Sequence, residues 1–203
     1  MSKNKNKKVD KWEGTLDRRD EFIGLVNTIC PNVVSQEMID WLVTNKFFDA
    51  PASRKYHGAH KGGLYDHSKT VASRLMELTT LNNLCWIRPE SPFIVGMFHD
   101  LCKIDQYLAK WDTSVEVSDN GDITLVDYNW NNNQLLKGHG DKSIMLLSQF
   151  MTLTEEEVLC IRYHMGAFVE KEEWNDYTRA ARKYETVLWT HHADMLASHV
   201  NLI

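Results

Sequence analysis

The sequence predicts an all-α fold that carries one short β-hairpin. Apolar residues recur at helical spacing along most of the 203-residue chain, whereas polar and apolar residues alternate clearly at about residues 113–127. No internal repeat and no long linker rich in Pro, Gly or Ser divides the sequence. We therefore expect a single helical domain over residues 13–203, long enough to bury a substantial core, after a disordered Lys/Asn-rich tail at residues 1–12.

Two helices are predicted near the N-terminus. The first is indicated by an apolar stripe at spacings of three and four, whose members are Phe22, Leu25, Val26 and Ile29. It ends before Pro31, which cannot continue a helix. A second stripe, at residues 38–43, follows Ser35, a residue type that commonly caps helix N-termini.

Two further helices are expected before residue 101. The third spans about residues 64–78 and follows the Gly62-Gly63 pair. The fourth begins at about Ser91, with Pro92 in its first turn, where proline is well tolerated. This fourth helix carries His99 and Asp100 near its end.

A β-hairpin is predicted to interrupt the helical pattern. Residues 113–117 and 123–127 alternate on the two sides of Asn120-Gly121, a pair that favours a turn with positive φ. Three aromatic residues flank this insertion: Trp111, Tyr128 and Trp130. They could stack on a nucleobase or hold the hairpin against the domain, and the sequence does not separate these two roles.

Helices resume after the hairpin. One is expected at about residues 139–150, and the next begins at Thr154, where Glu157 completes a capping box. A long final helix is predicted over about residues 177–200.

Charge and hydropathy exclude several classes of protein. The net charge is -5, and residues 1–11 hold five lysines against one aspartate, so the remainder carries 18 basic and 27 acidic residues, a net charge of about -9. An acidic body excludes a broad duplex-binding surface. The apolar stretch Phe93–Phe98 is too short to cross a bilayer. With no signal peptide visible and scattered cysteines, we expect a cytoplasmic protein.

Six residues of metal-binding types are spread along the predicted helices: His67, His99, Asp100, His139, His164 and Asp194. Mixed imidazole and carboxylate ligands suit Mn, Fe, Co, Ni or Zn better than Mg or Ca. His99 and Asp100 are adjacent, and adjacent residues on a regular helix point about 100° apart, so they can share one metal only near a helix end or bend. Lys103 follows Asp100 by three residues on the same face, and a metal-bound carboxylate beside an ammonium suits phosphate binding.

Three segments resemble the HD-domain metal-dependent phosphohydrolase superfamily. They are residues 60–68 (HKGGLYDHS), residues 97–104 (MFHDLCKI) and residues 193–197 (ADMLA). Their order and spacing match the family pattern H…HD…D, and the resemblance covers about residues 56–199. It implies a helical bundle with the metal at its centre.

The resemblance also implies a role for each candidate ligand. His67, His99, Asp100 and Asp194 would bind one metal ion. The segments around His139 and His164 are similar to those that carry two extra histidines in the dinuclear branches of the family. Asp100 would then bridge two divalent transition metals, with His139 and His164 on the second. Lys103 would act with Asp100 in catalysis.

The branches of the family differ in substrate. The segment after His164 is Gly166-Ala167-Phe168 instead of the G-Y-P of the cyclic-dinucleotide phosphodiesterases, which makes cyclic dinucleotides a less favoured substrate. The G-G-L-x-x-H-S stretch is most similar to a 3′→5′ exoribonuclease group, although the OB module of that group is absent. His60, His191 and Lys142 are our candidate substrate contacts, with a surface or packing role open for each. His57 has the same two possible roles as His60.

The function we expect is hydrolysis of a phosphoester in a nucleotide or short oligonucleotide by metal-activated water. Two alternatives use the same ligand set: a mixed-valence di-iron oxygenase, and a non-catalytic, metal-stabilised regulatory module. The sequence does not indicate an oligomeric state.

Overall fold

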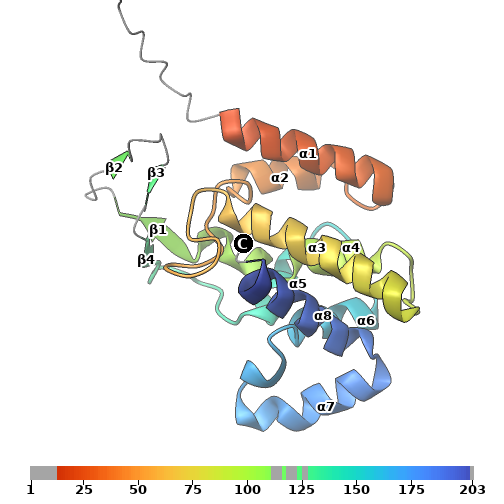
Figure 1. The fold of residues 1–203 in the computed structure, drawn as a ribbon. Helices are drawn as coiled ribbons and strands as arrows, with labels where there is room; N and C mark the ends of the chain where they lie inside the picture. The colour runs from red at the N-terminus through yellow and green to blue at the C-terminus, as the bar shows by residue number, and fades with distance from the viewer. Residues whose placement is uncertain (1–12, 111–115, 118–122, 125–127, 202–203) are drawn as a thin grey trace, which may run out of the picture.

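The computed structural model describes residues 13–110, 116–117, 123–124 and 128–201, and the helices among them dominate the fold (Figure 1). The α-helices are α1 (Glu13–Ile29), α2 (Gln36–Thr44), α3 (Gly63–Asn82), α4 (Ser91–Phe98), α5 (Gly140–Leu147), α6 (Glu155–Arg162), α7 (Trp174–Lys183) and α8 (Thr186–Met195). Short 3₁₀ turns cover Leu101–Asp105, Gly166–Phe168 and Lys171–Glu173. The predicted tail at residues 1–12 lies outside the described residues.

Local capping signals fix where two of the helices begin. The Ser35 hydroxyl accepts a hydrogen bond from the backbone N–H of Met38 at the start of α2. Thr154 and Glu157 form a reciprocal capping box at the start of α6. Both predicted N-termini are confirmed, because a side chain satisfies an amide that the helix itself leaves unpaired.

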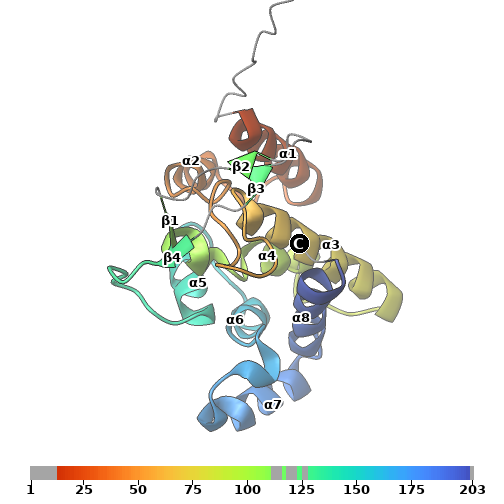
Figure 2. The same ribbon diagram turned by 60° about the vertical axis from the view of Figure 1, so that its left-hand side comes forward.

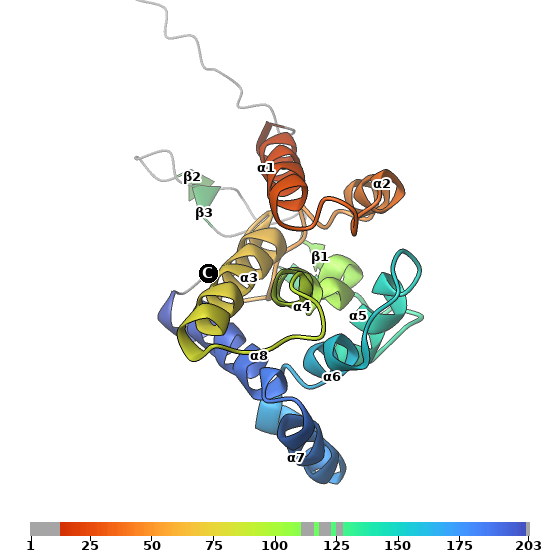
Figure 3. The same ribbon diagram turned by 90° about the vertical axis from the view of Figure 1, so that its right-hand side faces the viewer.

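Helix α4 lies at the centre of the bundle, and α3 packs along it (Figures 2 and 3). The close approach depends on Gly96: a Cβ atom added there would lie 2.4 Å from the Cα of Ala72 on α3. Helices α6 and α8 also pack against α4, and every residue of α4 is buried. This arrangement brings the C-terminal end of α4 to the middle of the domain.

An aromatic cluster joins the N-terminal helices to this centre. It consists of Phe22, Phe47, Phe48, Tyr65 and Phe98, all of them fully buried. Neighbouring rings have centroids 5.3 to 6.5 Å apart, mostly in tilted or edge-to-face arrangements that suit aromatic pairs. The cluster connects α1, the turn after α2, α3 and the last residue of α4.

The region of the predicted hairpin contains two separate antiparallel pairs of strands. Strand β2 (Glu116–Val117) pairs with β3 (Ile123–Thr124), as predicted, and the expected turn at residues 118–122 lies outside the described residues. Strand β1 (Tyr107–Ala109) also pairs with β4 (Tyr128–Trp130), so the insertion begins earlier than residue 113. Tyr107 lies opposite Trp130 in this register.

The prediction of one long final helix is wrong. The chain forms α7 and α8 in its place, because Tyr184 adopts an extended conformation (φ -131°, ψ 104°) that breaks the helix between them. A short π-helix, Leu196–Val200, then continues α8. Among the described residues, no helix combines the length and apolarity that crossing a membrane requires.

Candidate metal centre

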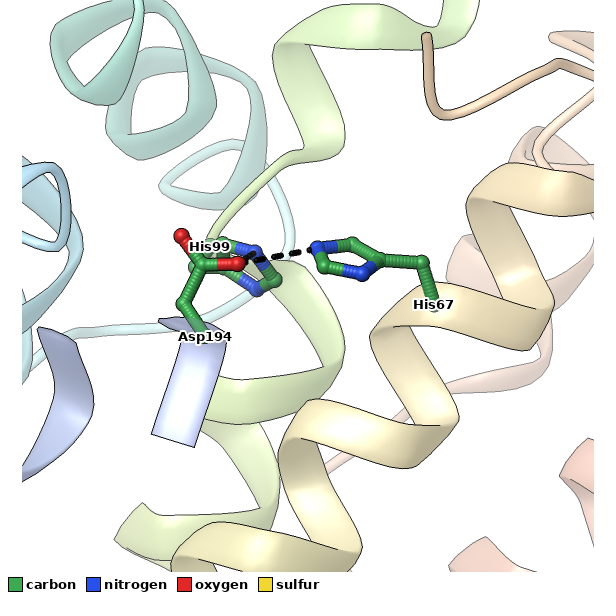
Figure 4. Close-up of side chains that lie close together, drawn as sticks. All are labelled: His67, His99 and Asp194. Carbon is green, nitrogen blue, oxygen red and sulfur yellow. Dashed lines mark ion pairs between the residues drawn. The ribbon is translucent and has the colours of Figure 1, made fainter. Parts of the chain in front are cut away.

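His67, His99 and Asp194 point toward one another from three different helices (Figure 4). His67 lies on α3, His99 is the C-cap of α4, and Asp194 is the penultimate residue of α8. The Nε2 atom of His67 lies 3.2 Å from Oδ1 of Asp194, and Nε2 of His99 lies 4.0 Å from the same oxygen. Segments far apart in the sequence therefore converge at one point.

Asp100 joins this group because α4 ends just before it. Its backbone (φ -103°, ψ 18°) leaves the helical conformation, so the adjacent side chains of His99 and Asp100 can face the same point. The Oδ2 atom of Asp100 lies 3.6 Å from Nε2 of His67 and 3.4 Å from Nε2 of His99. The expectation that this pair requires a helix end is confirmed.

The other carboxylate oxygen of Asp100 faces a second pair of histidines. Its Oδ1 atom lies 2.9 Å from Nε2 of His139 and 3.5 Å from Nε2 of His164. His139 precedes α5 directly and is the most open of these groups, with 31% of its side chain exposed, whereas His164 and Asp100 are buried. The two oxygens of one carboxylate thus face two separate sets of imidazoles.

Backbone carbonyls hold two of these rings in orientation. The Nδ1 atom of His99 lies 2.8 Å from the carbonyl oxygen of Gly96, and Nδ1 of His164 lies 2.6 Å from that of Ile161. Because a carbonyl can only accept, each Nδ1 carries the proton, and in the neutral ring each Nε2 keeps its lone pair toward the centre. This is the arrangement by which metal-binding histidines are commonly positioned.

The donor atoms are spaced as metal ligands would be. Ligand atoms about 2.1 Å from an ion lie about 3.0 to 3.4 Å from their neighbours in octahedral or tetrahedral geometry. The separations around Asp100 and Asp194, from 2.9 to 4.0 Å, bracket that range. Within the described part of the chain, the buried Nε2 atoms of His99 and His164 find no hydrogen-bond partner, which a bound ion would remedy.

Three overlapping groups have ligand atoms within 4.8 Å of one another. They are His67, His99 and Asp194; then His99, Asp100 and His164; and finally Asp100, Cys102 and His139. Together these groups contain all six residues singled out from the sequence. The residues present could therefore hold a metal ion.

The charges of the site favour ionised carboxylates and mostly neutral imidazoles. Burial alone would raise the pKa of Asp100, but the Lys103 ammonium and the neighbouring histidines hold it well below its usual value. Burial also opposes ionisation of Asp194, but the hydrogen bond from His67 together with the charges of His67, His99 and His164 lowers this pKa too. Burial lowers the pKa of His99 and of His139. These are the protonation states in which such groups bind metals.

His164 differs from the other imidazoles. Burial would lower its pKa, but the hydrogen bond and charge of Asp100, the charge of Asp194 and the backbone carbonyl of Ile161 together raise it. A proton on His164 would compete with any cation for Oδ1 of Asp100.

Lys103 lies directly against the same carboxylate. Its Nζ atom is 2.6 Å from Oδ2 of Asp100, and its side chain is almost completely buried. Burial would lower the pKa of Lys103, but the charge and hydrogen bond of Asp100 raise it, so the ammonium stays charged. The spacing of three residues predicted this proximity.

The three candidate substrate contacts lie in different places. His60 pairs with Asp66 at 3.1 Å and is half exposed, so the structure does not bring it into the group of six. The Nδ1 atom of His191 is 2.8 Å from the carbonyl oxygen of His164, where it supports the backbone of that residue. Lys142 is buried, and its ammonium pairs with Asp105 beside the centre.

His57 is closer to the centre than the sequence indicated. Its ring centroid lies 5.0 Å from that of His67. Burial and the nearby positive charges lower the pKa of His57 to about 4, so the ring is neutral at pH 7. Residue types do not distinguish His57 from His60, because both precede the Gly62-Gly63 turn and only the path of the loop separates them.

Cys102 is a second neighbour that the sequence did not indicate as part of the site. Its Sγ atom lies 3.4 Å from Nδ1 of His139. Burial raises the pKa of Cys102 to about 12, so the thiol stays protonated at neutral pH. In the sequence, only its position one residue before Lys103 could have indicated that Cys102 lies beside the candidate metal centre.

Fold and site together define a mostly helical protein with a buried group of His, Asp and Cys side chains that could bind a metal ion. Comparisons with protein-family models, curated proteins and solved structures found no match.

Proposed function

We propose that this chain is an HD-domain phosphohydrolase that uses two divalent transition metals to cleave a phosphoester of a nucleotide or short oligonucleotide. The proposal rests on the position of Asp100, whose two carboxylate oxygens face two different pairs of histidines. Its Oδ2 faces His67 and His99, and its Oδ1 faces His139 and His164. A carboxylate placed in this way suits a bridge between two ions.

The metals would be held by His67, His99, Asp100 and Asp194 on one side and by Asp100, His139 and His164 on the other. When bound, such a pair supplies a hydroxide nucleophile and neutralises charge on the phosphate. Mixed N/O donors favour Mn, Fe, Co, Ni or Zn for this role.

The residues around the donor set would bind and orient the substrate. Lys103 supplies a buried ammonium that can hydrogen-bond to a non-bridging phosphate oxygen. The low exposure of Lys103, Asp100 and Asp194 excludes bulk water, which strengthens these interactions. The more open side chain of His139 indicates the direction from which a substrate would approach.

The cysteines support a reducing compartment such as the cytoplasm. All four of them, Cys30, Cys85, Cys102 and Cys160, are unpaired in the structure.

Metal analysis of the purified full-length chain, followed by a hydrolysis screen, tests the proposal. We expect about two metal equivalents per chain, and phosphate or nucleotide release from nucleotides or dinucleotides with Mn under anaerobic conditions. Asp100→Asn should abolish both readouts. Wild-type metal content in that variant would overturn the bridging role.

A parallel aerobic assay of the Fe-loaded protein separates the two alternatives. Oxygen consumption with Fe, without phosphoester cleavage, would identify a di-iron oxygenase. Metal-loaded protein that is inert in both assays would identify a non-catalytic module. Either result overturns the phosphohydrolase proposal.

A further inference from the structure

A cavity of about 290 Å³ opens beside the more exposed half of the candidate metal centre. Its lining includes Cys102, Gln106, Trp130, Lys137, His139 and Lys142. His139 and Cys102 thus form the wall shared with the metal centre. The volume lies near the lower end of the range for small-ligand pockets, which suits one nucleotide unit.

Trp130 forms one side of this cavity, and its side chain is unusually exposed. It is 52% exposed although it is held in strand β4, and its ring packs on Tyr107 with centroids 5.1 Å apart. Tyr107 itself is anchored through a hydrogen bond that its hydroxyl accepts from the Gln106 amide. Trp130 is therefore a supported aromatic surface that remains open, and indole faces stack well on nucleobases.

The structure now separates the two roles that the sequence left open for the aromatic residues of the insertion. Tyr128 is only 6% exposed, so its side chain is buried in strand β4. Trp130, two residues later in the same strand, has the opposite environment. Trp111 lies outside the described residues.

Charged and polar groups complete the lining. Lys137 and Lys142 add two cationic side chains to a lining that also contains Trp130 and His139. Lys142 is buried and held by Asp105, so its position is fixed, whereas Lys137 is exposed. Gln106 adds an amide, a group that can hydrogen-bond to base edges.

We infer that this cavity is a nucleoside-binding subsite: the base stacks on Trp130, and the phosphate lies toward His139 and the two lysines. The inference rests on the proposed function and specifies its substrate. A phosphoester with a nucleobase would be preferred over the same phosphoester without one.

Calorimetric titration of the metal-loaded full chain with AMP and with ribose 5-phosphate tests the inference. We expect AMP to bind more tightly, and Trp130→Ala to weaken AMP binding by about 5- to 100-fold while leaving ribose 5-phosphate unchanged. Trp130→Phe should restore most of the affinity, because the stacking surface remains. Trp174→Ala is the matched control, since Trp174 is 47% exposed but lies on α7, away from the cavity.

Hydrolysis of the same two compounds is measured in parallel, so that failure of the subsite proposal can be distinguished from failure of the proposed function. Equal binding of AMP and ribose 5-phosphate, or equal losses in the Trp130 and Trp174 variants, would overturn the subsite whether or not either compound is cleaved. Binding of AMP that depends on Trp130, in a protein that cleaves neither compound and no substrate of the nucleotide and dinucleotide screen, would support the subsite and overturn the proposed function.

Discussion

The Nζ atom of Lys103 lies 2.6 Å from the same oxygen of Asp100 that faces His67 and His99. One oxygen is thus shared between a buried ammonium and one half of the candidate metal centre. Since the ammonium and a metal ion would both be positive, they can share Asp100 only if they approach Oδ2 from different directions, and a phosphate between them would relieve the repulsion.

Replacement of Lys103 by Met should separate metal binding from turnover. The metal content should stay near that of the wild type, because no candidate ligand is lost, while kcat falls by about 10² to 10³ as charge stabilisation of the phosphate disappears. Metal analysis and steady-state kinetics on one preparation measure both quantities. Lys69→Met, which removes an exposed lysine paired with Glu21, is the control. Unchanged turnover in the Lys103 variant would reduce that residue to a structural partner of Asp100.

Replacement of ligands on the two sides of Asp100 should remove different ions. His164→Ala should lose one metal equivalent and keep a folded protein, because the remaining groups around His67 stay intact. Asp100→Asn should lose both equivalents, since both sides use its oxygens. Elemental analysis with circular dichroism measures metal content and fold together. Asp176→Asn, on an exposed carboxylate paired with Arg179, is the control, and a similar metal loss there would contradict a specific effect.

Replacement of Gly96 by Ala should destabilise the domain and disturb the site. The new methyl group would overlap the backbone of Ala72, so α3 and α4 must move apart, at a cost of about 1–3 kcal/mol. Urea unfolding measures this cost, and metal affinity should fall as well, because α3 and α4 carry His67 and His99. Gly24→Ala is the matched control: its added Cβ would meet nothing within 4 Å, and we expect a gain of about 0.5–1 kcal/mol.

The Asp66 cluster should make stability depend on acidic pH. Burial opposes ionisation of Asp66, but hydrogen bonds from His60 and Arg18 outweigh it and lower its pKa to about 2. A lowered folded-state pKa stabilises the protein above the unfolded value of about 3.9, and this contribution is lost as the pH falls toward 2.

Asp66→Asn removes that contribution. The variant should lose about 1–2 kcal/mol of unfolding free energy at pH 7, after allowance for partial exposure, and the difference should shrink as the pH falls through about 4 toward 2. Urea titrations across this range measure it. A difference that stays constant with pH would show that Asp66 contributes through packing alone.

The sequence predicted correctly the helix N-termini that are set by a capping residue adjacent to the helix. Ser35 and Thr154 satisfy amides within their own first turns, so their effect is readable from a few positions. The break at Tyr184 was not predictable in this way. No Gly or Pro stands there, and helical periodicity continues across it, so the packing of the folded domain decides where α7 ends.

The same distinction applies to the candidate metal centre: residue types predicted some of its members, whereas loop path and strand register determined the position of others. The types of the six residues, and the family resemblance of the segments that carry them, predicted that these side chains would meet. The path of a loop has no such pattern, and for that reason His57 lies beside His67 while His60 pairs with Asp66. The open face of Trp130 depends on its register with Tyr107, which residue types alone do not fix.

Asp194 reaches the centre from the last α-helix, whereas His67 and His99 belong to the first half of the chain. A nascent chain emerging from the ribosome would therefore contain His67, His99 and Asp100 well before Asp194 is synthesised. The four-residue group would be complete only when the last α-helix has been made, close to the end of synthesis.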